Sequence, residues 1–224
     1  MELTEAVATR FSARAFLDRP VGREQVLRIL DRARQAPSGG NVQPWHVWVL
    51  AGKPLAEFKA RFVDADPLAG EPAEFDIYPS KLKQPYHARR FKCGEDLYAS
   101  IDVPREDRPG RLRQYAKNLQ FFGAPMALFF AMDRTMGLPQ WAHLGMFMQT
   151  IMLLAREEGL HTCAQEVWSH WHDSVTEVLA LPDEMKLYCG MAIGYLDEAQ
   201  PINQWRTDRA PLDEFVTLQG LDDS

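Results

Sequence analysis

The sequence is poor in cysteine and has no excess of positive charge, and each shortage excludes a class of protein. Its three cysteines, at positions 93, 163 and 189, form neither a cluster nor a C-x-x-C motif. This odd, scattered set excludes a disulfide framework and favours the reducing cytoplasm as the location. The 25 basic side chains are outnumbered by 31 acidic ones. Because nucleic-acid-binding domains normally carry a basic surface, we expect no nucleic-acid partner.

Targeting signals and membrane spans are also missing from the pattern. The N-terminal stretch carries Glu2 and Glu5 where a secretory signal needs positive charge followed by an apolar run. Residues 135–155 lack formal charge, but they include Pro139, His143 and Gln149, which are costly in hydrocarbon. We interpret this segment as a buried core helix and expect no membrane partner.

Glycine and proline are not abundant enough for a low-complexity or fibrous chain, at 14 and 15 of 224 residues. The length and composition predict one globular domain over residues 1–224. Within it, the periodicity degrades in the proline-rich segment at about 65–110, which is expected to be a partly helical lid or insertion. The tail at about 198–224 is too apolar for a free terminus and is expected to lie against another surface.

Hydrophobic periodicity predicts alternating helices and strands. The expected helices cover residues 2–10, 23–36, 53–64, 113–122, 139–158 and 173–181. The expected strands cover residues 46–51, 126–132, 163–168 and 187–196, the first of them as a buried strand. Together these elements indicate a mixed α+β layer structure. The helix over 139–158 is apolar almost all round, so sheet, other helices or a second subunit must enclose it.

Two arginines flank a serine near the N-terminus, in the order Arg10, Ser12, Arg14. Guanidinium groups at i and i+4 can bind one phosphate together with the serine hydroxyl. The alternative is that both arginines are solvated and paired with acidic residues nearby in the sequence. The pattern alone leaves both interpretations open.

The loop over residues 36–44 is rich in turn formers and amides. Gly39 and Gly40 allow backbone N–H groups to approach a ligand closely, and Asn41 and Gln43 can both donate and accept hydrogen bonds. An ordinary helix-to-strand turn is the alternative. The histidines of His170-Trp171-His172 lack a third ligand at zinc spacing, so we expect no metal site.

Several strings taken together carry a resemblance to a known family. R-x-S-x-R-x-F at 10–16 is followed by A-P-S-G-G-N-x-Q-P-W at 36–45, by N-L-Q-F-F-G-A-P at 118–125 and by T-x-R-x-P-L-x-E at 207–214. In this order the chain resembles the FMN-dependent nitroreductase family. The resemblance implies a nitroreductase-like fold, with a central, mostly antiparallel β-sheet flanked by helices. It also implies an intertwined homodimer with a swapped C-terminal tail and two FMN sites at the subunit interface.

The resemblance assigns residues to the cofactor one by one. Arg10, Phe11, Ser12 and Arg14 match the family's window around the FMN phosphate and ribityl chain, and Arg209 matches the tail arginine that closes on the same phosphate. Two further groups match the loop that reaches the flavin from the second subunit and the strand end whose backbone N–H faces flavin N5. They are Pro37, Ser38, Gly39 and Asn41 for the loop, and Gln165 and Glu166 for the strand end.

The implied activity is that of an FMN-dependent NAD(P)H oxidoreductase. NADH or NADPH would give a hydride to the flavin and leave, and a nitroaromatic, quinone-like or related electron-poor acceptor would then be reduced in a ping-pong reaction. Because the flavin performs the redox chemistry, we nominate no catalytic side chain. Two alternatives remain: reductive dehalogenation or flavin fragmentation on the same scaffold, and a non-catalytic FMN-binding protein.

Overall fold

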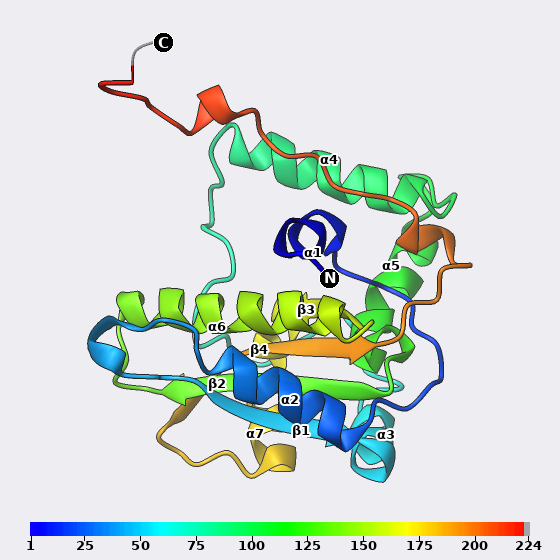
Figure 1. Ribbon diagram of the computed structural model, residues 1–224. Coiled ribbons are helices and arrows are strands. Elements are labelled where there is room, and N and C mark those ends of the chain that lie inside the picture. The colour runs from blue at the N-terminus through cyan, green and yellow to red at the C-terminus, as the bar shows by residue number, and fades with distance from the viewer. Residues whose placement is uncertain (222–224) are drawn as a thin grey trace.

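A computed structural model describes residues 1–221 as a four-stranded β-sheet between layers of helices (Figure 1). The strands are β1 (His46–Ala51), β2 (Met126–Asp133), β3 (His161–Gln165) and β4 (Met185–Gly194). They lie in the order β1-β2-β4-β3, and every neighbouring pair is antiparallel. The α+β class and the antiparallel sheet predicted from the sequence are confirmed.

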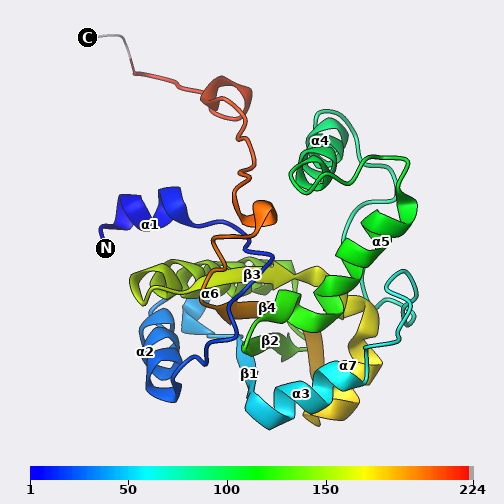
Figure 2. The same ribbon diagram turned by 90° about the vertical axis from the view of Figure 1, so that its right-hand side faces the viewer.

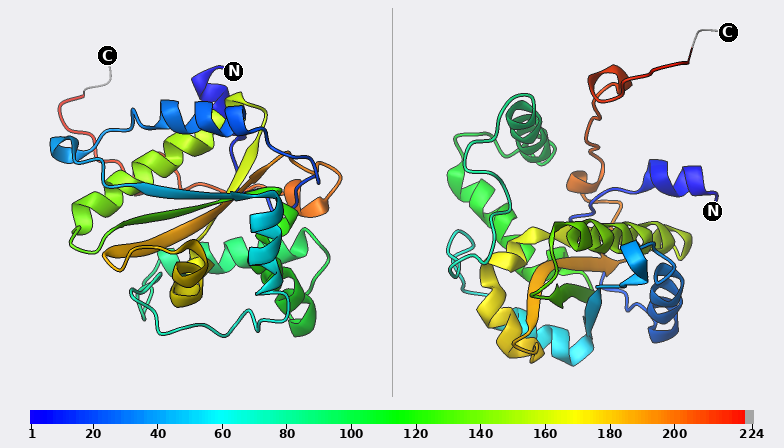
Figure 3. Two further views of the ribbon diagram at one scale, coloured as in Figure 1. Left: turned by 90° about the horizontal axis from the view of Figure 1, so that it is seen from below. Right: turned by 90° about the vertical axis from the view of Figure 1, so that its left-hand side faces the viewer.

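Residues 1–221 form seven α-helices. They are α1 (Leu3–Thr9), α2 (Arg23–Ala33), α3 (Gly52–Ala60), α4 (Tyr86–Ala99), α5 (Arg108–Ala116), α6 (Leu138–Glu157) and α7 (His172–Leu179). The sheet separates α2 and α6 from α3, α5 and α7 (Figure 3). None of the helices within residues 1–221 is both long and apolar enough to cross a membrane.

Alternation along β2 places a core on each face of the sheet. Leu128 and Phe130 point toward α2 and α6, whereas Ala127 and Phe129 point toward α3 and α7. All eight residues of β2 are buried or nearly so, because the strand pairs on both sides. β1 is one of the two edge strands of this sheet and is only half-buried, so the expectation of a buried strand there is wrong.

Two other predicted elements end earlier than expected. The helix expected over 113–122 is α5 followed by a 3₁₀ helix over 117–123, in which Phe121 and Phe122 have φ values of 50° and 53°. Both rings are buried, so packing holds these residues in a region they rarely adopt. The strand expected over 163–168 is β3, which ends at Gln165, and a 3₁₀ helix over 166–171 follows.

Helix α6 presents two different faces. Leu144, Phe147 and Ile151 are buried in the core above the sheet. Gly145 and Met146, on the opposite side, are exposed in the single chain. The sheet and α2 therefore cover only part of the apolar surface of this helix.

Helix α4 of the predicted insertion and the tail form an outer layer away from the sheet, whereas Phe75 of the same insertion packs against Trp141 and Tyr188. Helix α4 has no buried residue, and it stands apart from the body (Figure 2). The tail runs past α4 and away from the core (Figure 1), and its side chains Leu212, Phe215 and Leu218 are all about two-thirds exposed. The last three residues of the predicted tail, 222–224, lie outside the described part of the chain.

Candidate active site

Backbone pairing brings the two ends of the chain to the same edge of the sheet. Ser12 forms a parallel bridge with Thr162 of β3. Asn203, which is almost fully buried, accepts a hydrogen bond from the Arg14 backbone N–H at 2.9 Å and donates its amide to the carbonyl of Ala15, also at 2.9 Å. Segments nearly 190 residues apart in sequence are thereby fixed beside each other.

This edge contains a cavity of about 490 Å³ between α1, the segment after it and the tail. Five residues that the sequence assigned to one site line it together: Arg10, Phe11, Ser12, Arg14 and Arg209. Trp205, Arg206, Thr207 and Cys93 complete the polar end of the wall. The arginines of the N-terminal motif and of the tail therefore face one space.

The guanidinium groups around this cavity have no acidic partners. Within residues 1–221, no carboxylate oxygen lies within 4.0 Å of Arg10, Arg14, Arg206 or Arg209. Arg14 donates instead to the carbonyl of Ser12 at 3.1 Å, and Arg206 to that of Asn203 at 2.6 Å. The alternative of pairing with nearby acidic residues is therefore wrong, and the cluster has unused capacity for an anion.

The cations perturb one another. The pKa of Arg10 is lowered by burial and by the neighbouring charge of Arg209. His161, behind Phe11, has a pKa lowered to about 4 by burial and by Arg156 and Arg206. Mutual repulsion of this kind is relieved when a multiply charged anion enters.

A second cavity, of about 390 Å³, adjoins the first and shares Arg14 and Cys93 with it. Its floor includes the end of β3 and its roof includes α4, so Gln165 and Glu166 line it. Glu166 is exposed, yet partial desolvation by the cavity walls raises the pKa of its carboxyl group. The family-derived assignment of these two residues to one site is thus compatible with the geometry.

Two buried amide atoms in the second cavity lack hydrogen-bond partners within the described chain. They are Nε2 of Gln114, a donor, and Oε1 of Gln165, an acceptor. The amide nitrogen of Gln165 is already used, since it donates to the carbonyl of Asn118 at 2.8 Å. Buried polar atoms are rarely left unpaired, so an adjacent ligand with both acceptors and donors would satisfy them.

The loop expected to reach the flavin lies elsewhere in the single chain. Pro37, Ser38, Gly39 and Asn41 do not line either cavity. The Gly39 N–H donates to Nε2 of His143 at 3.2 Å, which places the loop beside the N-terminal half of α6 (Figure 1). Loop and cavities are therefore not brought together within one chain.

Several residues of the site were not identified from the sequence. Arg206 stacks on Phe11, with its guanidinium carbon 3.5 Å from the ring centroid. It belongs to the R-T-D-R run of the tail, so proximity to Arg209 was an available signal. Gln114 and Asn203 act through contacts that only the folded chain creates, and no local pattern marks them.

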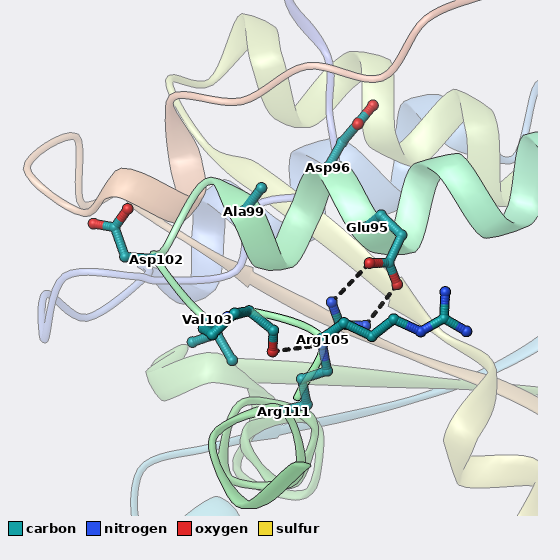
Figure 4. A pocket seen from close by; sticks show the side chains of 8 residues that line it. Glu95, Asp96, Ala99, Asp102, Val103, Arg105 and Arg111 are labelled. Atoms are coloured by element: carbon teal, nitrogen blue, oxygen red, sulfur yellow. Dashed lines mark hydrogen bonds and ion pairs between the residues drawn. The ribbon is translucent and has the colours of Figure 1, made fainter. Parts of the chain in front are cut away.

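A separate depression of about 520 Å³ lies at the C-terminal end of α4 (Figure 4). Glu95 there accepts two hydrogen bonds from Arg111, at 2.7 and 2.9 Å. Asp96 and Asp102 point away from this pair. The two central charges of this depression are therefore already paired with each other, unlike the arginines that line the first cavity.

The fold is that of an α+β protein, with an antiparallel sheet between helices. Its two adjoining cavities suit a ligand that has a phosphate group at one end and a ring with hydrogen-bond donors and acceptors at the other. The chain belongs to the nitroreductase family, whose sequence model matches residues 7–195.

Similar proteins cover nearly the whole chain. A 4-nitrobenzoate reductase of Pseudomonas putida is 37% identical over 222 residues, covering 96% of this chain and 95% of the relative. A nitrobenzene nitroreductase of Ectopseudomonas oleovorans is 36% identical over 218 residues, covering 96% of each. The crystal structure of the FMN and NADPH-dependent nitroreductase NfnB from sphigopyxis sp. strain HMH aligns with a TM-score of 0.93 and 44% identity, covering 99% of this chain and 100% of that one.

Proposed function

We propose that this protein is an FMN-dependent oxidoreductase that reduces nitroaromatic compounds with electrons from NADPH or NADH. The observation that carries the proposal is the arginine cluster without acidic partners, directly beside a cavity containing unpartnered amides. The named activities of the relatives and the FMN and NADPH dependence of the similar structure support it.

The residues present fit FMN at both of its ends. A phosphate dianion would offset the positive charges of Arg10 and Arg209, whose mutual repulsion lowers the pKa of Arg10, and Arg14 lines the same cavity. A flavin ring carries both acceptors and an N–H donor, which match the free Nε2 of Gln114 and Oε1 of Gln165. We assign Arg10, Ser12, Arg14 and Arg209, with Phe11, to the phosphate and ribityl end.

The protein's own contribution is binding, orientation and the supply of a polar environment. When bound, FMN supplies the redox chemistry, accepting two electrons from the nicotinamide and delivering two to the nitro group. The arginines fix one end of the site, and the end of β3 fixes the other through Gln165 and Glu166. Glu166, whose pKa is raised, can hold a proton nearer to neutral pH than an ordinary glutamate. We nominate no catalytic side chain.

We further propose a homodimer in which each site is completed by the partner. The exposed apolar side chains Leu3 and Val7 of α1, Met146 of α6, and Phe215 of the tail need a covering surface. A second copy placed against α6 would bring in its own loop, with Pro37, Ser38, Gly39 and Asn41. The tail at about 198–224 would wrap around the partner, and the segment at about 65–110 would act as a lid, all within one domain over 1–224.

The location is proposed from the cysteines. Cys93, Cys163 and Cys189 are all free in the structure. This pattern supports the cytoplasm, where thiols stay reduced.

The test is to purify the protein, measure bound FMN per chain and follow anaerobic oxidation of NADPH and NADH with nitrobenzene or 4-nitrobenzoate. We expect one FMN per chain and nicotinamide oxidation that depends on the nitroarene. Sedimentation analysis of the full chain and of a variant ending at residue 210 tests the dimer. A chain without affinity for FMN would overturn the function, whereas a monomer that reduces nitroarenes would overturn only the dimer.

A further inference from the structure

Helix α4 carries three long cations, and two of them are neutralised. Arg89 pairs with Glu214 of the tail. Lys92 pairs with Asp96 on its own helix and with Asp208 of the tail at 2.9 Å. These partners keep both side chains on the tail side of α4, so neither contributes free charge to the second cavity.

Arg90 differs from Arg89 and Lys92 in two ways: it has no acidic partner among the described residues, and its side chain lies at the second cavity. Within residues 1–221, no carboxylate lies within ion-pair distance of it. Its guanidinium carbon lies 4.2 Å from the ring centroid of Tyr78, and both residues line the second cavity. Stacking on Tyr78 occupies the face of the guanidinium plane and leaves the N–H groups at its edge available.

We propose that Arg90 selects acceptors that carry a carboxylate on the nitroarene ring. The inference rests on the proposed function and adds the substrate class and the residue that reads it. Tyr98 and Tyr115 line the same cavity, so an aromatic ring finds aromatic neighbours there. A carboxylate on that ring can accept two hydrogen bonds from the guanidinium edge of Arg90.

The charges of the cavity also give the acceptor a direction. Glu166 at the end of β3 is the carboxyl group that lines this space, and it repels a second carboxylate when ionised. An acidic nitroarene is therefore expected to turn its carboxylate toward α4 and its nitro group toward the β3 end. That is the end to which Gln165 and Glu166 were assigned.

A phosphate group of the nicotinamide nucleotide is another anion that could meet Arg90. Arg14, the other arginine that lines this cavity, also lines the first cavity and donates to the carbonyl of Ser12. Arg90 on α4 therefore offers the edge of one guanidinium, which suits one carboxylate better than a phosphate dianion. The phosphate-type cluster lies instead in the first cavity, around Arg10 and Arg209. We therefore assign Arg90 to the acceptor, and the experiment separates the two sources.

The experiment compares 4-nitrobenzoate with its neutral isostere 4-nitrobenzamide in the FMN-loaded full-length enzyme and in Arg90→Gln. We expect kcat/KM for 4-nitrobenzoate to fall by about tenfold or more, as for loss of hydrogen bonds to a charged group. The value for 4-nitrobenzamide should stay within about twofold, and Arg90→Lys should restore part of the difference because it keeps the charge.

Arg105→Gln is the matched control. Arg105 also stacks on an aromatic ring, Phe91, at 5.0 Å, but it lines the depression outside the site (Figure 4). It should leave both acceptors unchanged. Equal losses for the acid and the amide, or a changed KM for NADPH alone, would overturn the assignment of Arg90. Failure of the wild-type enzyme to reduce either acceptor would instead refute the proposed function.

Discussion

The sheet with its helices and the outer layer of α4 and the tail differ in how far their apolar side chains are buried. Around the sheet, two clusters of large apolar side chains are buried on both faces, with Phe58, Phe129 and Trp168 fully inaccessible. In the outer layer, α4 has no buried residue, and Phe215 of the tail is about two-thirds exposed. The first region has its own apolar core, whereas the second leaves apolar side chains exposed in the single chain.

The candidate site lies where these two regions meet. Its floor, at the end of β3, belongs to the stable sheet, and its walls come from α4 and the tail. Such an arrangement joins a fixed base for the cofactor to movable walls that can admit different molecules in turn.

The largest difference between the two regions is expected in the free energy of unfolding, when one aromatic ring is removed from each. Phe58→Ala deletes a ring that is fully buried among other aromatics and should lower the free energy of unfolding by about 3–5 kcal/mol. Phe91→Ala, on the half-exposed face of α4, should cost less than about 1 kcal/mol. Urea denaturation of the two variants measures both. Similar losses would show that the outer layer is as tightly packed as the sheet.

The same division explains which elements could be predicted from the sequence. β1, β2 and α6 were predicted to within one residue at each end, because each is a nearly continuous apolar segment with turn-forming residues beside it. β1 is nevertheless less buried than expected. The expected helix over 139–158 stops before Gly159, whose φ of 74° is typical of a glycine that ends a helix. The left-handed backbone at Phe121 was not predictable, since tertiary packing overrides the local preference there.

Only part of the candidate site could be predicted from the sequence, for a similar reason. The motifs around Arg10 and Arg209 could be assigned by resemblance, and the fold places them at one cavity. The contacts of Gln114 and Asn203 are long-range, so they became visible only in the folded chain. Arg90 has neighbours of the same charge in sequence, and only its direction distinguishes it from Arg89.

The start of β3, behind Phe11, should be sensitive to acid through His161. Its pKa of about 4 lies below the ordinary value of 6.5, so the unfolded chain binds the proton more tightly. The contribution of neutral His161 to the free energy of unfolding is present in full above pH 6.5. It is lost as the pH falls toward 4, by about 3 kcal/mol. His161→Gln should flatten this dependence in FMN-free protein, whereas His87→Gln, at an exposed position, should not. Denaturation curves at pH 4.5 and 7.5 provide the comparison, and identical slopes for all three proteins would contradict it.

The arginine cluster should lower the stability of the FMN-free protein while it raises the affinity for FMN. In Arg10→Met, removal of a cation that is half-buried and repelled by Arg209 should leave the FMN-free protein as stable as before or more so. FMN affinity should fall by about 1.5–3 kcal/mol, the usual value for a hydrogen bond to a charged group. Thermal denaturation without FMN and fluorescence titration with FMN measure the two effects. Arg23→Met, at a solvent-exposed ion pair, is the control and should change neither.

The smallest effect is expected where the tail is tied to α4 by charge. Arg89 and Glu214 are both about 44% exposed, so Glu214→Gln should cost about 0–1 kcal/mol of stability and less at high salt. The apolar residues beside it are more exposed still, and Phe215→Ala should weaken subunit association more than Glu214→Gln does. Sedimentation of both variants at low and high ionic strength compares them. If Glu214→Gln dissociates the subunits more readily than Phe215→Ala does, ion pairs rather than apolar contacts hold the tail in place.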